Sequence, residues 1–151
     1  MIEQTILRNL ILNEDYSRKV LPYLKDVYFH DPADLALFQV VSEYTIKFNK
    51  LPNWEVVKVE LSQRHGFSDD TFKRLSKNIE ELQANTEVDN IDWLVESTEK
   101  FCKSKALYNA LILSNEIIQQ TGKSKLSEGS IPGIMSDALS ITFNPNLGLG
   151  Y

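Results

Sequence analysis

The chain has 151 residues, of which 42% are hydrophobic and 25% are charged, with only 6 glycines and 5 prolines. This composition excludes a disordered protein and suits one domain with one sizeable core, and a second full domain is not expected. Sixteen Lys and Arg stand against 21 Asp and Glu, and the resulting net charge of -5 argues against a dedicated DNA-binding module, because such modules neutralise phosphates with excess positive charge.

Residues 1–85 show the apolar spacing of amphipathic helices and lack alternating, strand-like runs. Asn13 can cap a short helix that carries Tyr16 and Val20, and Pro22 predicts a break near the end of that helix. A helix before it has one apolar face, formed by Ile2, Ile6, Leu7, Leu10 and Ile11.

Asp31 and Pro32 predict the start of a third helix. The aspartate side chain can accept a hydrogen bond from a free backbone N–H, and proline fits the first helical position because it has no N–H to leave unpaired. The core-facing positions of this helix are expected to be Leu35, Leu37, Phe38, Val41, Tyr44 and Phe48.

Two further helices complete the predicted bundle. The first follows residues 51–53, carries Trp54, Val57 and Leu61, and is expected to end at a left-handed cap at Gly66. The second starts at Ser68, where two aspartates suit the positive end of the helix dipole. Its core stripe is predicted to be Phe72, Leu75, Ile79 and Leu82. Residues 1–85 are therefore interpreted as a small helical bundle.

Residues 90–121 contain neither proline nor glycine and predict one helix about 45 to 48 Å long. A compact domain of this chain length is only about 35 to 40 Å across, so the helix is expected to project from the bundle. Its first half has one apolar stripe, formed by Ile91, Leu94, Val95, Thr98, Phe101 and Cys102. Beyond Lys105, apolar residues extend further around the helix, so this half needs two packing partners.

A short return helix is predicted to start at Ser130 and Pro132, and its apolar positions are Ile131, Ile134, Met135, Ala138, Leu139 and Phe143. Folding back on the long helix would give a hairpin over residues 86–143. The fold class is therefore all-α, a small bundle followed by a projecting helical hairpin. The side of the hairpin left uncovered is typical of an interface. We predict self-association through Leu107, Tyr108, Leu111, Ile112, Leu113, Ile117, Ile118, Ile134, Met135 and Leu139.

Candidate catalytic and metal-binding motifs fail on spacing. Residues 122–124 match the end of an ATPase phosphate-binding loop, but Ile117 occupies the position of its first glycine and a helix precedes it. His30 and His65 lack a second ligand at metal-binding spacing, and Cys102 lacks a CxxC partner. We expect no catalytic, cofactor-binding or metal-binding residue in this chain.

Several stretches resemble the N-terminal domain of the DnaB family of replicative DNA helicases, nearest its T-even-like phage branch. They are "EQTILRNLIL", "YFHDPADLALFQVV" and "LPNWEVVKVEL" in the bundle, and "WLVESTEKFCKSKALYNALILSNEIIQQ" and "IPGIMSDALSITF" in the hairpin. The resemblance spans essentially the whole chain and rests on helix order and apolar spacing.

The resemblance implies a non-catalytic collar domain of a hexameric helicase, in which such domains pair through their hairpins and three pairs form the collar where primase docks. The implied partners are the chain itself, as a dimer or a trimer of dimers, a DnaG-like primase and a helicase loader. ATP, Mg and DNA unwinding would belong to the implied parent protein, with residues 144–151 starting the linker to its ATPase domain.

A stand-alone helical adaptor or regulatory module is the alternative function, and a small helical enzyme of unrecognised type is a third. The chain has one cysteine, no signal peptide, and no run of about 18 apolar residues that would span a membrane. We therefore expect a cytoplasmic location, in the host cytoplasm if the protein is phage-encoded, with no membrane role and little direct binding of nucleic acid.

Overall fold

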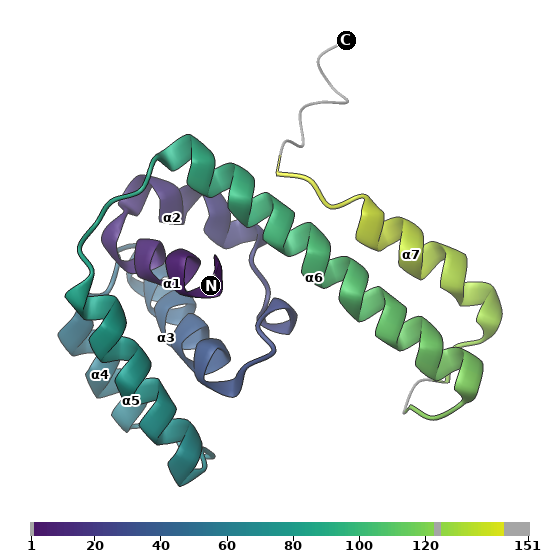
Figure 1. Ribbon diagram of the computed structural model, residues 1–151, viewed down its shortest axis with the longest axis horizontal. Coiled ribbons are helices and arrows are strands. Elements are labelled where there is room, and N and C mark those ends of the chain that lie inside the picture. Colours follow the sequence, from purple (N-terminus) through teal and green to yellow (C-terminus); the bar gives the residue numbers. More distant parts are fainter. Residues whose placement is uncertain (1, 123–124, 144–151) are drawn as a thin grey trace. The chain divides into compact units, whose positions relative to one another are not determined.

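The computed structural model describes residues 2–122 and 125–143, and they are mainly helical (Figure 1). Within this part of the chain there are seven α-helices, three short 3-10 helices and no strand, so the predicted all-α class is confirmed. The chain divides into two compact units, Met1–Glu96 and Ser97–Tyr151, and the division falls inside the longest helix. The expected boundary between residues 85 and 86 and the projection of the hairpin stay predictions. The expected linker at residues 144–151 lies outside the described residues.

Helix α3 is the centre of the first unit, because α1, α4 and α5 all pack against it. Helix α1 also packs against α2 and α5. The elements of this unit that precede its last helix are α1 (Ile2–Leu12), α2 (Glu14–Val20), η1 (Leu21–Tyr23), η2 (Asp26–Tyr28), α3 (Pro32–Phe48), α4 (Trp54–Ser62) and α5 (Asp69–Ala84).

Three predicted helix starts are confirmed by their capping hydrogen bonds. The side-chain oxygens of Asn13, Asp31 and Ser68 accept from the backbone N–H groups of Tyr16, Ala33 and Thr71 at 3.1, 2.8 and 3.1 Å, respectively. Each cap satisfies a donor that the helix itself leaves free, which typically contributes about 1 kcal/mol. The break near Pro22 is also confirmed, since α2 ends at Val20 and a 3-10 turn follows.

The core of the first unit is built from the predicted stripes. Phe38 is 2% exposed, and its ring stacks on that of Phe29 with the centroids 4.6 Å apart. The buried side chains contributed by the other helices include Ile6, Leu7, Leu10, Tyr16, Val20, Val57, Leu61, Leu75, Ile79 and Leu82.

Two aromatic residues expected in the core are exposed. Phe48 is the last residue of α3, where Asn49 turns the chain with a left-handed φ of 53°, and its ring lies against Tyr44 and not in the core. Phe72 lies in the first turn of α5, which begins at Asp69, and it is only about 20° around the helix from the buried Ile79, so its exposure follows from its place at the helix end. The exposed fractions of Phe48 and Phe72 are 53% and 47%.

The predicted cap of α4 at Gly66 is wrong. Helix α4 ends at Ser62, and the N–H of Gln63 bonds to the carbonyl groups of Glu60 and Leu61, which closes the last turn without a left-handed residue. Gly66 does adopt a φ of 94°, but it does so later in the loop between α4 and α5.

A polar cluster fixes the segment that leads into the long helix. Asp89 Oδ2 accepts hydrogen bonds from Arg8 Nη2 at 2.8 Å and from Asn9 Nδ2 at 3.1 Å. Arg8 and Asn9 are both buried on α1, so the carboxylate is held by an ion pair with Arg8 and by a second charge-assisted hydrogen bond from Asn9. Asn90, the next residue, caps the long helix by accepting from the N–H of Trp93 at 3.0 Å.

We expect Phe38→Glu to unfold the bundle, because the substitution buries an unpaired charge and removes the stacking on Phe29. The expected loss of stability is more than about 3 kcal/mol. Thermal unfolding followed by circular dichroism measures it, with Phe72→Glu as the matched control at a half-exposed site. Equal melting temperatures for the two variants would contradict the assignment of Phe38 to the core.

A pH effect is expected at Asp34, which is buried and accepts a hydrogen bond from Gln4 Nε2 at 2.8 Å. Burial raises the pKa of the Asp34 carboxyl, the Gln4 hydrogen bond opposes that change, and the charges of Asp31 and Glu3 add to it. The folded state therefore binds this proton more tightly than the unfolded state, so stability falls as the pH rises through the folded pKa.

Asp34→Asn keeps the acceptor for Gln4 without the charge and should be more stable than the parent at about pH 7. The advantage should shrink near pH 4, at about the pKa of an unfolded aspartate. Chemical denaturation at both pH values measures it, with the exposed Glu60→Gln as control. A constant difference across this range would show that the carboxyl is not responsible.

Candidate functional site

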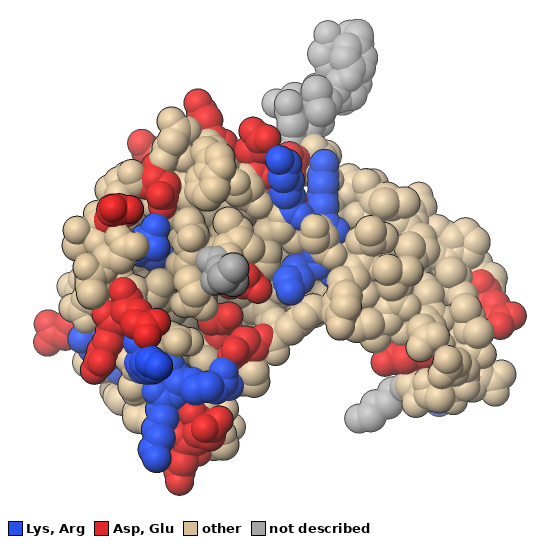
Figure 2. Space-filling model, viewed as in Figure 1, with Lys and Arg blue, Asp and Glu red and all other residues tan. Residues whose placement is uncertain are grey.

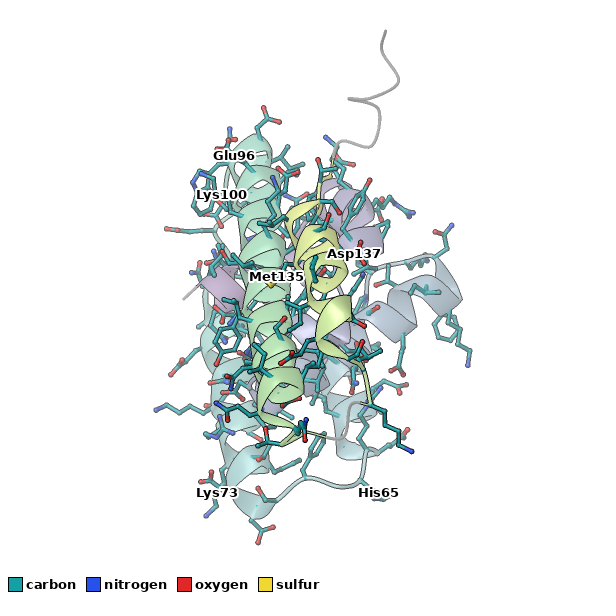
Figure 3. All side chains as sticks on the ribbon, turned by 90° about the vertical axis from the view of Figure 1, so that its right-hand side faces the viewer. His65, Lys73, Glu96, Lys100, Met135 and Asp137 are labelled. Carbon is teal, nitrogen blue, oxygen red and sulfur yellow. The ribbon has the colours of Figure 1, made fainter. Side chains whose placement is uncertain are left out.

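Two antiparallel helices form a hairpin that contains the candidate site. Helix α6 (Ile91–Gln119) is followed by η3 (Glu128–Ser130) and α7 (Ile131–Leu139), and α7 runs alongside α6 in both views (Figures 1 and 3). At 1.5 Å per residue, α6 is about 43 Å long. The predicted long helix is confirmed, and it ends slightly early because Gln120 adopts a left-handed φ of 56°.

The buried side of α6 changes direction along the helix. Its first half buries Leu94, Thr98, Phe101 and Cys102, and its second half buries Ala110, Ser114 and Ile117. At 100° per residue, the mean directions of these two sets differ by about 140°. The two halves of α6 therefore cannot be covered by one straight neighbouring surface.

Small residues occupy three of the four buried positions in the second half of α6 and in α7. Ala110 and Ser114 on α6 and Ala138 on α7 are all buried, which suits close approach of two helices. Met135 lies between α6 and α7 (Figure 3) and is half-buried, as are Ile131 and Ile134. The inward positions of α7 thus follow the spacing of one helical face.

The segment after α7 is tied back to α6 by a glutamate. Phe143 was expected on the return helix, but α7 ends at Leu139. Instead, the backbone N–H of Phe143 donates to Glu99 Oε2 at 2.6 Å, and Thr142 Oγ1 lies 3.3 Å from the same oxygen. Glu99 was not singled out in the sequence, because no local pattern links residues 44 positions apart.

One side of the second half of α6 is left uncovered. We call it the α6 face and define it by Leu107, Tyr108, Leu111, Ile112 and Ile118, which span an arc of about 140° at 100° per residue. Tyr108, Leu111, Ile112 and Ile118 are 52%, 53%, 42% and 56% exposed, and Leu107 is half-buried.

The other predicted interface residues occupy different environments. Leu139 on α7 is 67% exposed and Ile117 is 6% exposed, while Leu113, Ile134 and Met135 are half-buried. Ile117 therefore contributes to the interior of the chain. Whether the others contact a second copy stays a prediction.

Charge is sparse around the α6 face. Glu116 is the only charged residue between Leu107 and Gln119, and the visible surface of this half of the hairpin is mostly free of charged side chains (Figure 2). Interfaces between proteins have few charged residues at their centre and are enriched in aromatic residues and Met. An apolar surface of this kind is suited to burial against another protein.

Neither a metal-binding cluster nor a membrane-spanning helix is found in the described residues. In that part of the chain, no group of three or more His, Cys, Asp or Glu side chains could hold a metal ion. His30 and His65 are both exposed. None of the described helices has the length and apolar character needed to cross a membrane.

Comparison with known proteins supports the resemblance seen in the sequence. No family model matches the chain. A DnaB-like replicative helicase of Enterobacteria phage T4 is 28% identical over 152 residues, covering 96% of this chain and 31% of the helicase. The chain thus spans about a third of the length of the curated relative that it matches. This similarity over nearly the whole chain supports a relationship to DnaB-like replicative helicases.

Proposed function

We propose that this chain is the N-terminal collar and oligomerisation domain of a hexameric replicative DNA helicase of the T-even-like phage branch, acting in the host cytoplasm. The proposal rests on the similarity to the phage T4 helicase together with the apolar α6 face. In this proposal the fragment is non-catalytic, and ATP, Mg and DNA unwinding belong to the rest of the parent protein. The domain pairs through its hairpin, and three pairs form a trimer of dimers.

The α6 face carries the proposal of self-association. Fully burying one such side chain contributes about 1.5 to 3 kcal/mol, so a half-exposed side chain gains on the order of 1 kcal/mol. Five of them on each of two copies would then supply about 10 kcal/mol, within the estimated 4 to 15 kcal/mol that association costs. Pairing is therefore expected to be modest for the isolated chain and stronger in a ring, where linked copies are held at high effective concentration.

We expect Leu111→Glu to convert the chain to a monomer with nearly unchanged helicity, because Leu111 lies near the middle of the α6 face and a charge there opposes burial. Sedimentation velocity measures the association and circular dichroism measures the helicity. Gln83→Glu adds the same charge at an exposed position on α5 and should associate as the parent does. Leu113→Glu tests the neighbouring, half-buried position. Association of both leucine variants equal to that of the parent would refute the proposed interface.

The proposed partners of the assembled collar are a DnaG-like primase and a helicase loader. Several copies of the domain in one ring multiply weak contacts, so one isolated copy can bind its partner poorly. We expect an intact helicase that lacks residues 1–143 of this chain to lose mutual stimulation with its primase. Primer synthesis by the primase and strand separation by the helicase, each assayed with and without the other protein, measure this effect. Stimulation at the level of the intact protein would contradict the docking role.

A further inference from the structure

The first unit carries a cleft of its own. Helices α4 and α5 both pack against α3 and leave between them a cleft of about 300 Å³. It is lined by Lys58, Leu61 and Ser62 on α4 and by Phe72, Leu75, Ser76, Ile79 and Glu80 on α5. Both helices can be followed in Figure 1.

The lining of the cleft is apolar at the bottom and open at the side. Leu61, Leu75 and Ile79 are 3%, 2% and 5% exposed and belong to the core. Phe72 also lines the cleft but is 47% exposed. An aromatic ring left half open beside core residues provides an apolar contact for a bound chain, and such rings are frequent among residues that dominate binding energies.

The two edges of the cleft carry opposite charges. Lys58 lies on α4 and Glu80 lies on α5, and both are exposed. Within the described residues, the side chain of neither takes part in an ion pair. A ligand that fills the apolar bottom would therefore meet one positive and one negative edge, and charge complementarity requires it to carry one acidic and one basic flank.

The length of the cleft indicates the kind of ligand. Its lining residues on α5 run from Phe72 to Glu80, a span of about 12 Å at 1.5 Å per residue. Apolar side chains at positions i, i+4 and i+7 of a bound helix span about 10.5 Å, which fits this length. A stable homodimer buries about 800 Å² on each partner, far more than a cleft bounded by two or three helical turns can offer.

We propose that the α4–α5 cleft binds an amphipathic helix of a partner protein, with apolar residues at i, i+4 and i+7 between one acidic and one basic flank. The apolar residues contact Leu61, Phe72 and Ile79, while the flanks pair with Lys58 and Glu80. The inference deepens the proposed docking role and is independent of self-association through the α6 face. Nucleic acid is a poor alternative, because a cleft with one Lys and one Glu does not neutralise a phosphate backbone.

The test uses three peptides of about 16 residues, crosslinked so that they stay helical. All three carry Leu at i, i+4 and i+7, and they differ only in their flanks, which are mixed, all acidic or all basic. Binding to the full chain is measured by fluorescence anisotropy. A helical peptide can lie in the cleft in either direction, and reversing it exchanges the cleft edges that its acidic and basic flanks face. The mixed, all-acidic and all-basic peptides remain distinct whichever direction they take.

We expect the mixed peptide to bind about threefold tighter than the other two, since exposed ion pairs are weak. Lys58→Glu should shift the preference to the all-basic peptide, and Glu80→Lys should shift it to the all-acidic peptide. Phe72→Ala should weaken all three by about tenfold. Lys77→Glu and Glu81→Lys on α5, outside the cleft, are the matched controls and should leave the preference unchanged.

Failure of all three peptides to bind at about 1 mM, an unchanged affinity in Phe72→Ala, or a flank preference that ignores Lys58 and Glu80 would each overturn the proposal. If Phe72→Ala proves unstable by circular dichroism, the two edge variants decide, because both sites are exposed.

Leu111→Glu should bind the mixed peptide as the parent does. Loss of binding in that variant would assign the peptides to the α6 face and contradict the cleft. Normal self-association without peptide binding would reject the proposed binding in the cleft and leave the proposed self-association unaffected.

Discussion

The unbroken course of α6 is the constraint on which the rest of the hairpin depends. From Ile91 to Gln119 there is no proline or glycine, and Asn90 caps the first turn, so the helix continues while its buried side changes direction. The apolar residues of the second half cannot all be covered by the surface that covers the first half. Helix α7 covers part of that second half, and the α6 face is what remains.

The distribution of charge follows the same division. The first half of α6 carries Asp92, Glu96, Glu99, Lys100, Lys103 and Lys105, whereas the stretch from Leu107 to Gln119 carries only Glu116. Charged side chains lose hydration when they are buried, and the loss is expensive unless each is paired. A helix half with one charge and four exposed apolar side chains is therefore suited to the contact with protein that we propose.

Much of the fold could be predicted because it is encoded locally. The caps at Asn13, Asp31 and Ser68 need only a side chain and an N–H two or three residues away. Core stripes were readable where a position lies at the centre of an apolar face within a helix, as for Phe38, but not at a helix end, as for Phe72. The prediction of a helix cap at Gly66 was wrong because the φ of 94° at this residue occurs in the loop and not at the helix end.

Long-range features could not be read from the sequence. The contacts of Asp89 with α1 and of Glu99 with Phe143 join residues 80 or 81 and 44 positions apart, and no periodicity marks them. The cleft between α4 and α5 likewise arises from how two helices lie on a third. For the candidate site, the sequence indicated which residues are apolar, but only packing separates the buried Ile117 from the exposed Ile118.

The central claim is that the α6 face is covered by a second copy of the chain. Static light scattering of the unmodified chain, coupled to size exclusion, tests it most directly across a range of concentrations up to about 100 μM, where modest pairing energies are sufficient for association. Pairing through the α6 face predicts a mass that rises with concentration to that of two or more chains. A mass of one chain throughout the range would contradict it.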